Sequence, residues 1–591
     1  MDRRRFLAGS ALTLPALRAF AEHSAAPMKG TEAPSAPLNA SAGNAMPASI
    51  RYLYIPKPQF WSFDNLDPQF SMGGYTLSFQ AFTYGDQQNT FSLDRNSVKQ
   101  TNDGDNWTVT ASQLSWPGQQ LPFPGSFEAR VTVKNQRVYL NMKATANEKI
   151  RGIKVKVHNL PTGKVAQTGW EVDPYFVDVP EPGVNFNYPE YQGGIPVWFL
   201  AQSGDKGISF SSLDLDPRPK RFAAYPQNGT LTVDLIVDQD ARMLSTSFEA
   251  PTWVIEKNTD LQNAIDLRTQ LLEGKAGLKR WEDRPDVPQW AREVRLVVTL
   301  HGMHWSGYIF NDYRAMMERV KWITDRIGGR KVLFFLAGWE GRYYRTYGNS
   351  HVDTRMGGDA DFRHLIEFIH QRGAHVMAMF SGNYPSPGLP GYDDYTRDSF
   401  FQALPGNLRW SDMRGYVTDW AEIRAGVNEG APVNPGAPGW RDHLTNQIAM
   451  LNRTYKLDGT FLDTQPNGDN DTRYSPLEGL RSIASHLRAE SPELLLATES
   501  WFDLSLGIVP TSQTPDGPFR WSRKYQRRWA HLSMGEPSRG STGVHELGHI
   551  PYKLDDVLQA YDLAAVAIVE DTIEKAPEAV ETVLKYAKAM A

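Results

Sequence analysis

The sequence predicts a multidomain β plus α/β protein, in which an N-terminal antiparallel β-sandwich is followed by a (β/α)8 barrel of the TIM type. Three observations support this prediction. The chain has 591 residues, which is too many for one hydrophobic core. Its first half consists of short alternating runs separated by turn dipeptides. Its second half alternates apolar strand-like runs with helix-like runs, a pattern typical of a parallel sheet covered by helices.

The composition describes an ordinary globular protein, with 41% hydrophobic and 22% charged residues. The formal net charge is -5, and no basic stripe follows the first few residues, so nucleic acid is not an expected partner. Aromatic residues are abundant at 12%, with 17 Trp and 24 Tyr, which suits either rings that stack on sugars or a β-rich core. The chain has no cysteine, so no disulfide framework is expected.

Residues 1–21 predict an export signal. The basic start RRRFL resembles the twin-arginine signal of bacteria, and it is followed by an apolar stretch and the small-residue site Ala19-Phe20-Ala21. Residues 22–49 are mostly Ala, Ser, Pro and Gly and predict a disordered linker. We therefore expect a periplasmic or secreted protein; a chance basic start on a cytoplasmic protein is the alternative. No later apolar run reaches about eighteen residues, so no membrane span is expected in the mature protein.

Residues 50–257 predict the β-sandwich. Alternating runs such as WTVTAS, FEARVTV, RVYLNMKAT and LTVDLIV are separated by Asn-Gly, Gly-Asp, Pro-Gly and Asp-Pro turns, and no long helical pattern interrupts them. These features favour two packed antiparallel sheets. Residues 258–286 predict a helical linker, because apolar residues recur there at helical spacing.

Residues 287–591 predict the barrel. Five strand candidates are regular, and they lie at 294–302, 331–341, 375–384, 459–462 and 494–497. The helix candidates are at 313–327, 361–372, 440–455 and 475–492, with a closing helix at 576–590. The runs WAHLSM, GVHELGHI and AAVAIVEDT are less regular candidates for the last three strands. Eight candidates match a (β/α)8 barrel. An open doubly wound sheet is the alternative, and it is weakened because no GxGxxG loop follows the first strand.

Two acidic residues stand at the ends of neighbouring predicted strands. Asp463 ends the run GTFLD, and Glu499 follows the run LLLAT. In a barrel of parallel strands the chemistry lies at the carboxyl ends. Two carboxyl groups at a short separation are what a retaining glycoside hydrolase needs, with Asp463 as nucleophile and Glu499 as acid/base. The structural alternative is that each carboxylate caps a helix or pairs with an arginine. Glu340, Glu536 and Asp503 are the substitutes for Glu499.

Other polar and aromatic residues at strand ends are candidates for binding the substrate. The polar candidates are His301, Glu340 and Asn383. Rings that could stack on a sugar are Trp305, Trp339, Tyr343, Tyr384 and Trp440, although any one such residue is more often a packing residue at the barrel rim. We expect an oligosaccharide, a polysaccharide or a glycoconjugate as substrate, and no cofactor.

The segment HELGH, from His545 to His549, matches the HExxH signature of zinc peptidases, and Glu570 could supply a third ligand. That mechanism needs a long helix. Gly548 lies inside the motif and Pro551 follows it, which disfavours such a helix. We therefore interpret His545 and His549 as substrate-contacting residues at the barrel mouth and expect no metal, with a zinc metallopeptidase as the alternative function.

The segment Asp458-Gly459-Thr460-Phe461-Leu462-Asp463 resembles the DGxxxD signature on the fourth strand of retaining barrel glycoside hydrolases. The closer resemblance is to the endo-α-N-acetylgalactosaminidase-like group, to which Trp339, Gly357-Gly358-Asp359 and Asn434-Pro435 are also similar. The resemblance implies that Asp463 is the nucleophile, that a Glu at the end of the fifth strand is the acid/base, that the bond is α-linked, and that Asn434 contacts substrate. α-Amylases carry an Arg two residues before their nucleophile, and this chain has Phe461 at that position, which argues against an α-amylase. A non-catalytic carbohydrate-binding protein is the remaining alternative.

Overall fold

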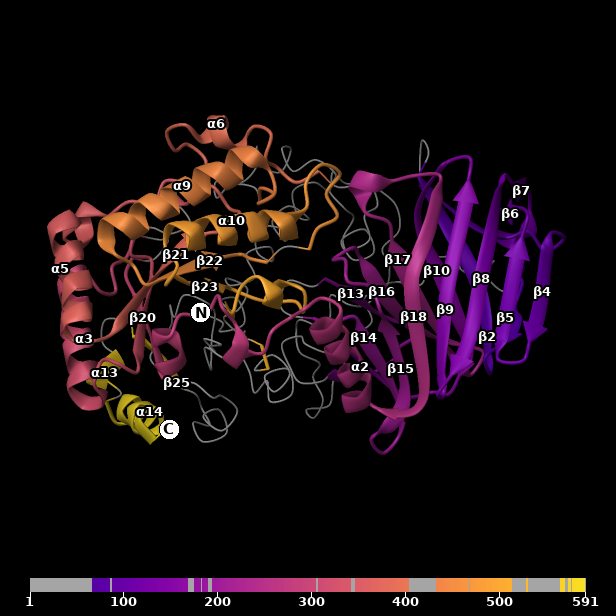
Figure 1. The fold of residues 1–591 in the computed structure, drawn as a ribbon, viewed down its shortest axis with the longest axis horizontal. Helices are drawn as coiled ribbons and strands as arrows, with labels where there is room; N and C mark the ends of the chain where they lie inside the picture. The colour runs from indigo at the N-terminus through magenta and orange to yellow at the C-terminus, as the bar shows by residue number, and fades with distance from the viewer. Residues whose placement is uncertain are drawn as a thin grey trace, which may run out of the picture.

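The computed structural model describes residues 66–84, 88–167, 175–181, 183–189, 194–303, 307–341, 346–402, 432–466, 468–512, 528–529, 564–568, 572–575 and 577–589. The predicted signal and linker lie outside these residues and stay predictions, as do two of the three irregular strand candidates. Figure 1 shows two domains side by side, with the antiparallel sheets at one end of the molecule and the parallel sheet with its helices at the other.

The first domain is the predicted antiparallel β-sandwich. Its described strands form two sheets of nine strands each. The first sheet has the order β13-β16-β17-β10-β2-β3-β6-β7, with β1 paired to β2. Its strands are β1 (Phe70–Met72), β2 (Tyr75–Tyr84), β3 (Gln88–Leu93), β6 (Leu114–Ser115), β7 (Pro122–Phe123), β10 (Lys149–Leu160), β13 (Val184–Tyr188), β16 (Lys220–Gln227) and β17 (Thr230–Asp238).

The second sheet has the order β12-β11-β14-β15-β18-β9-β8-β5-β4. Its strands are β4 (Val98–Asp103), β5 (Asn106–Ala111), β8 (Gly125–Lys134), β9 (Arg137–Ala146), β11 (Lys164–Gln167), β12 (Tyr175–Asp178), β14 (Val197–Ser203), β15 (Lys206–Ser212) and β18 (Ser247–Asp260). The hairpin between β8 and β9 turns through Asn135 and Gln136, whose φ angles of 51° and 63° match the two-residue turns that fit the twist of a hairpin.

The second domain contains a sheet of parallel strands. The seven strands described have the order β24-β23-β22-β21-β20-β19-β25, and every neighbouring pair is parallel. They are β19 (Leu296–His301), β20 (Val332–Ala337), β21 (His375–Ser381), β22 (Gly459–Asp463), β23 (Leu495–Thr498), β24 (Thr511–Ser512) and β25 (Ala564–Ile568). Closure into eight strands stays a prediction, because the chain between β24 and β25 is almost entirely outside the described residues.

Helices cover the outer face of this sheet (Figure 1). They are α3 (Tyr313–Ile327), α5 (Gly358–Gln371), α6 (Tyr392–Thr396), α9 (Pro438–Tyr455), α10 (Pro476–Glu490), α13 (Thr572–Lys575) and α14 (Pro577–Ala589). The Ser475 side chain caps α10 by accepting a hydrogen bond from the amide of Glu478, and Pro476 occupies the first turn. None of the described helices is long and apolar enough to cross a membrane.

Alternate residues of the parallel strands separate into an outer and an inner layer. Val298, Phe334 and Phe380 belong to the outer layer, which packs against the helices. Inner-layer residues form a separate cluster; on the central strands they are Val297, Leu333, Phe335, Ala337, Met377, Met379, Phe461, Leu495 and Ala497. Since strand residues alternate between faces, the next inward positions after Phe461 and Ala497 are Asp463 and Glu499.

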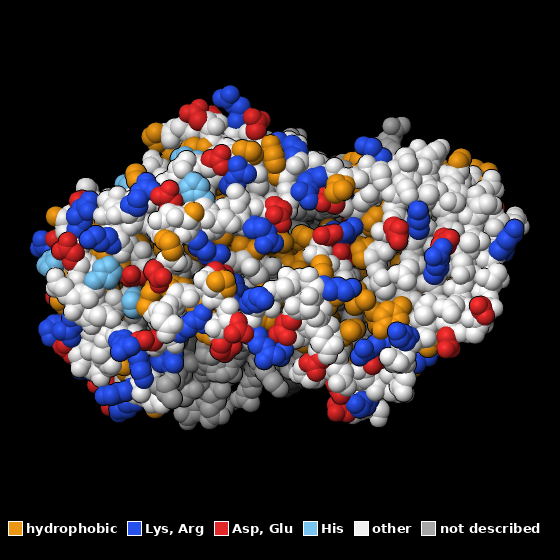
Figure 2. Space-filling view, in the orientation of Figure 1, with side chains coloured by type: hydrophobic (Ala, Val, Ile, Leu, Met, Phe, Trp, Pro, Cys, Tyr) orange, Lys and Arg blue, Asp and Glu red, His pale blue; other side chains and the backbone are white. Residues whose placement is uncertain are grey.

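Helix α2 (Leu261–Gly274) follows β18 directly and lies where the two domains meet (Figure 1). Its apolar residues Ala264, Ile265 and Leu272 pack in a cluster that also contains Phe199 of the sandwich and Trp501 of the second domain. Figure 2 shows hydrophobic side chains gathered at this junction, whereas charges of both signs are interspersed over the visible face of both domains. The two domains therefore share a packed interface.

Candidate active site

The carboxyl ends of five neighbouring parallel strands meet at one edge of the sheet. His301 ends β19, Ala337 ends β20, Ser381 ends β21, Asp463 ends β22, and Glu499 follows the last residue of β23. The ladder pairs Ser381 with Asp463, so their positions are adjacent. This edge is the place where active sites form in barrels of parallel strands.

Asp463 is a buried carboxyl group with a specific donor. It is 1% exposed, and its Oδ2 accepts a hydrogen bond of 2.7 Å from the Tyr347 hydroxyl. Burial raises the pKa of Asp463 to about 6, an effect that the Tyr347 hydroxyl and the Thr464 amide partly offset. A carboxyl group poised near neutrality is unusual for aspartate, and such groups concentrate at functional sites.

Glu499 lies beside the same backbone amide. Its Oε2 accepts a hydrogen bond of 2.9 Å from the amide N–H of Thr464, the residue that follows Asp463. Because that amide also acts on Asp463, the two predicted catalytic carboxyl groups converge on one peptide unit. Thr464 has a φ of 60°, which is rare for a β-branched residue and marks a backbone that its surroundings hold in place.

Glu340 is a third acidic residue at this edge. It is 1% exposed, and the Ser350 side chain is its polar neighbour. Burial raises the pKa of Glu340 to about 8; Ser350 lowers it in part, and the charge of Asp463 raises it further. Glu340 therefore carries its proton at neutral pH, while Asp463 is mostly ionised there.

Trp339 does not face the site, which contradicts its predicted role in stacking on sugar. It is fully buried in the outer layer, stacks on Phe362 with ring centroids 5.1 Å apart, and donates its indole N–H to the Met379 carbonyl. The reason is Gly338, whose φ of 64° breaks the alternation of β20. A Cβ there would lie 2.4 Å from the Met303 carbonyl oxygen, so only glycine fits.

Asn434 and Trp440 stabilise the backbone around the site. The Asn434 side chain is fully buried, donates to the Tyr474 carbonyl at 3.0 Å and accepts from the Gly436 amide at 2.8 Å. Trp440 is also fully buried and donates to the Gly382 carbonyl at 2.9 Å. Their polar groups are used within the protein, so neither presents a free side chain to a substrate in this structure.

Asn383 and Tyr384 follow β21, and Asn383 is bonded to the residue after Asp463. The Asn383 Oδ1 accepts a hydrogen bond from the Thr464 hydroxyl, which links it to the residue whose amide N–H is bonded to Glu499. Tyr384 is half-buried and packs against the inner apolar cluster. His301 is fully buried, and its ring lies 5.0 Å from that of Phe310.

Asp503 is not available as a substitute for Glu499. It is fully buried, pairs with Arg268 at 2.7 Å and accepts a hydrogen bond of 2.6 Å from the Tyr188 hydroxyl. The remaining candidates Trp305, Tyr343, Glu536, His545, His549 and Glu570 lie outside the described residues. In the part of the chain that the structure describes, no three His, Cys, Asp or Glu side chains gather as metal ligands.

Sequence reasoning missed Tyr347. This residue lies in the loop after β20, where no strand or helix pattern marks it. Its backbone exchanges two hydrogen bonds with Ser386, which follows β21: the Tyr347 amide donates to the Ser386 hydroxyl at 3.0 Å, and the Ser386 amide donates to the Tyr347 carbonyl at 2.7 Å. These contacts fix the phenol against Asp463. Only a prediction of the loop path could have found it.

Known structures resemble this chain in fold. The α-N-acetylgalactosaminidase NagBb from Bifidobacterium bifidum, in a complex with Gal-NHAc-DNJ, aligns with a TM-score of 0.54 at 12% identity, covering 76% of this chain and 78% of that one. Its GalNAc complex aligns with a TM-score of 0.52 at 12% identity, covering 76% and 79%. The GH36 α-galactosidase AgaA from Geobacillus stearothermophilus aligns with a TM-score of 0.49 at 12% identity, covering 86% and 74%.

No family model matches the sequence, and no curated protein matches it. At 12% identity, the two alignments to the B. bifidum enzyme show a shared fold across about three quarters of the chain. The roles of individual residues are therefore assigned from the geometry of this chain and not from these alignments.

Proposed function

We propose that the protein is a glycoside hydrolase that cleaves an α-linked glycosidic bond by a retaining double displacement. The observation that carries this proposal is the convergence of Asp463 and Glu499 on the Thr464 amide at the carboxyl ends of adjacent parallel strands. Two carboxyl groups close to one bond are the minimum apparatus for glycoside hydrolysis. The fold shared with an α-N-acetylgalactosaminidase supports both the reaction class and the α linkage.

In the first step, the ionised Asp463 attacks the anomeric carbon while the leaving oxygen takes a proton. A covalent glycosyl-enzyme forms, and water then hydrolyses it with net retention. A pKa of about 6 leaves Asp463 mostly ionised at neutral pH. The Tyr347 hydroxyl favours the ionised form and fixes which oxygen is turned away from the attack.

We assign the proton transfers to Glu499. It is 9% exposed, whereas Asp463 and Glu340 are each 1% exposed, so Glu499 is the most exposed of the three acidic residues. Glu340 keeps its proton at neutral pH and is suited to donate a hydrogen bond to a substrate hydroxyl.

The first test is a screen of aryl α- and β-glycosides and of natural glycans, followed by ¹H NMR of the first product formed from the best substrate. We expect turnover of an α-glycoside with an α-configured initial product. An initial β-product would replace the retaining mechanism by an inverting one. Binding of glycans without any turnover would instead identify a carbohydrate-binding protein.

The second test separates Glu499 from Glu340. A residue that protonates the leaving group is dispensable when the leaving group is already acidic. Glu499→Gln should therefore lose most activity on an alkyl glycoside and keep much of its rate of bond cleavage on a dinitrophenyl glycoside. Glu340→Gln should lower both rates alike. The reverse pattern would exchange the two assignments.

A further inference from the structure

We propose that the sandwich domain is a working part of the active site, because it holds the loop that begins with Glu499 and the loop that follows Asp463. The first loop, residues 499–503, begins with Glu499. The second, residues 464–474, follows Asp463. Each is attached to the sandwich side of the interface by its own buried polar contact. This inference rests on the proposed function for its kinetic part only.

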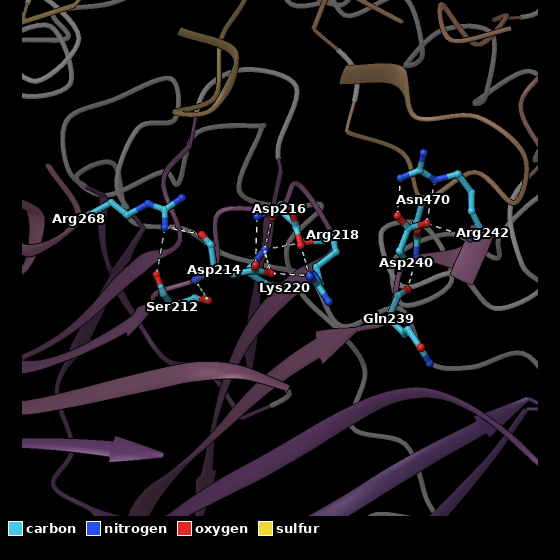
Figure 3. A network of polar contacts seen from close by, with 10 residues as sticks. All are labelled: Ser212, Asp214, Asp216, Arg218, Lys220, Gln239, Asp240, Arg242, Arg268 and Asn470. Atoms are coloured by element: carbon cyan, nitrogen blue, oxygen red, sulfur yellow. Dashed lines mark hydrogen bonds and ion pairs between the residues drawn. The ribbon is translucent and has the colours of Figure 1, made fainter. Parts of the chain in front are cut away.

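The first contact is the ion pair between Arg268 on α2 and Asp503 at the end of the first loop. The Arg268 Nε lies 2.7 Å from Oδ2 of Asp503, and the two side chains are 1% and 0% exposed. The other carboxylate oxygen accepts from the Tyr188 hydroxyl at the end of β13. Arg268 also donates to the backbone carbonyls of Ser212 and Asp214, as Figure 3 shows. Both oxygens of Asp503 thus face donors from the sandwich side.

The second contact is made by Asn470. Its Nδ2 donates to the Gln239 carbonyl at 3.0 Å (Figure 3). Its Oδ1 accepts from the Ala241 amide at 2.9 Å. Gln239 and Ala241 follow β17 of the sandwich. The same loop passes close to the sandwich at Gly468, where a Cβ would lie 2.5 Å from the Pro189 Cβ. Only glycine permits this approach.

The two loops are also bonded to each other at the carboxyl groups. The Ser500 amide donates to the Gln465 carbonyl at 2.9 Å, and the Thr464 amide donates to Glu499 at 2.9 Å. A continuous path of hydrogen bonds and chain therefore runs from Arg268 through the first loop to Glu499, across to Thr464, and through the second loop to Asn470. Movement at either attachment displaces the peptide on which both carboxyl groups converge.

A buried ion pair contributes little net stability compared with apolar side chains of similar size, because desolvation opposes the attraction. The ion pair has a larger effect on the position of the loop than on stability, because a carboxylate bonded at both oxygens has one orientation. Small displacements of catalytic groups cost roughly 100-fold in rate. Arg268 and Asn470 are therefore positioning residues, which act on the catalytic carboxyl groups through the loops they hold.

The test compares Arg268→Gln, Arg268→Lys and Asn470→Ala with the control Arg137→Gln, which removes a more exposed ion pair away from the interface. Arg137 forms an ion pair of 2.8 Å with Glu256 between β9 and β18, within the sandwich. Hydrogen exchange of the full-length protein without substrate, resolved by peptide, measures the mobility of the two loops directly. We expect Arg268→Gln to accelerate exchange in 499–503 and 464–474 by roughly tenfold, and Asn470→Ala to act mainly on 464–474. The control should change neither loop.

Kinetics on the best glycoside then separate positioning from simple tethering. Measured well below each unfolding temperature, kcat should fall roughly 10- to 100-fold in Arg268→Gln with a small change in KM. Arg268→Lys should recover part of this loss, because the charge remains while the fork of donors is lost. The control should keep the wild-type kcat.

Each outcome decides one question. Unchanged exchange in both loops of Arg268→Gln and Asn470→Ala overturns the proposal, whatever the activity. Faster exchange with an unaltered kcat reduces the contacts to structural tethers and also overturns it. A wild-type protein that hydrolyses no glycoside defeats the proposed function, and the exchange data still show whether the sandwich holds the loops.

Discussion

The two ends of strand β22 carry aspartates in opposite electrostatic states. Asp458 precedes the strand, and Asp463 ends it. Burial alone would raise the pKa of Asp458, but the His370 side chain and the Val376 amide, each at 2.9 Å from Oδ2, bring it below the ordinary value. Burial raises the pKa of Asp463 to about 6, with donors too few to reverse the effect.

The difference shows how one strand separates stability from reactivity. At the amino end, the Asp458 carboxylate accepts hydrogen bonds from donors on α5 and β21, so it holds these two elements to β22. At the carboxyl end, a similar group is buried with one side-chain donor, and Glu340 nearby keeps its proton. Groups left partly unsatisfied in this way destabilise the fold and are suited to chemistry. The division matches barrels in which the amino-terminal face serves stability and the carboxyl-terminal face serves catalysis.

The largest expected effect comes from exchanging the two aspartates for asparagine, one at a time. Asp463→Asn removes the nucleophile while keeping its shape, so kcat on the best glycoside should fall on the order of 10⁴-fold or more. Asp458→Asn should leave kcat of the folded protein within about twofold, because residue 458 lies at the other end of the strand. Steady-state kinetics at 25 °C measure both. Equal losses in the two variants would contradict the division of roles.

Much of the fold follows from the sequence, because the spacing of apolar residues and the capping of helices are local features of the chain. Helix α3 spans the predicted residues 313–327, since its apolar face repeats at helical spacing and Asp312 caps it. Strand β24 escaped prediction. It has two residues, Thr511 and Ser512, and exists because it pairs with β23, which no local pattern reveals.

The candidate site was predictable only where it depends on strand ends. Asp463 and Glu499 converge because parallel neighbouring strands end together. Trp339 was assigned to the wrong face because Gly338 reverses the alternation; the sequence shows the glycine but not its φ of 64°. The ion pair of Asp503 with Arg268 joins residues 235 positions apart, and such a contact has no signature in a single sequence.

The second-largest expected effect is a change in stability when the aspartates of β22 are substituted. The sign of this change should differ between Asp463 and Asp458. Asp463 and Glu340 have raised pKa values in the folded protein, so the stability associated with each is full below its unfolded pKa and is lost as pH rises through about 6 and about 8. Each pKa unit corresponds to about 1.4 kcal/mol. Asp463→Asn and Glu340→Gln should therefore raise the unfolding temperature at pH 8.5 and leave it nearly unchanged below pH 4.

Asp458 should show the opposite behaviour. Its pKa is lowered on folding, so its stabilisation is present above the unfolded pKa and is lost as pH falls through the folded one. Asp458→Asn should cost about 1–3 kcal/mol at pH 7 and progressively less in acid. Thermal unfolding of the wild type and the three variants across pH 3.5–9 measures these effects. A common sign for Asp458→Asn and Asp463→Asn at pH 8.5 would remove the electrostatic basis of the comparison.

The smallest expected effect concerns the single side-chain donor at the reactive end. Tyr347→Phe removes the hydroxyl that lowers the pKa of Asp463, so that pKa should rise above about 6. The nucleophile must be ionised, and the acid limb of the kcat/KM profile should therefore move to higher pH, with a loss of roughly tenfold at pH 6 and less at pH 8. Tyr313→Phe is the matched control, because the Tyr313 hydroxyl is also buried but donates to the Trp339 carbonyl at 2.6 Å. A loss from Tyr347→Phe that is uniform across pH would mean that the phenol positions Asp463 without tuning its ionisation.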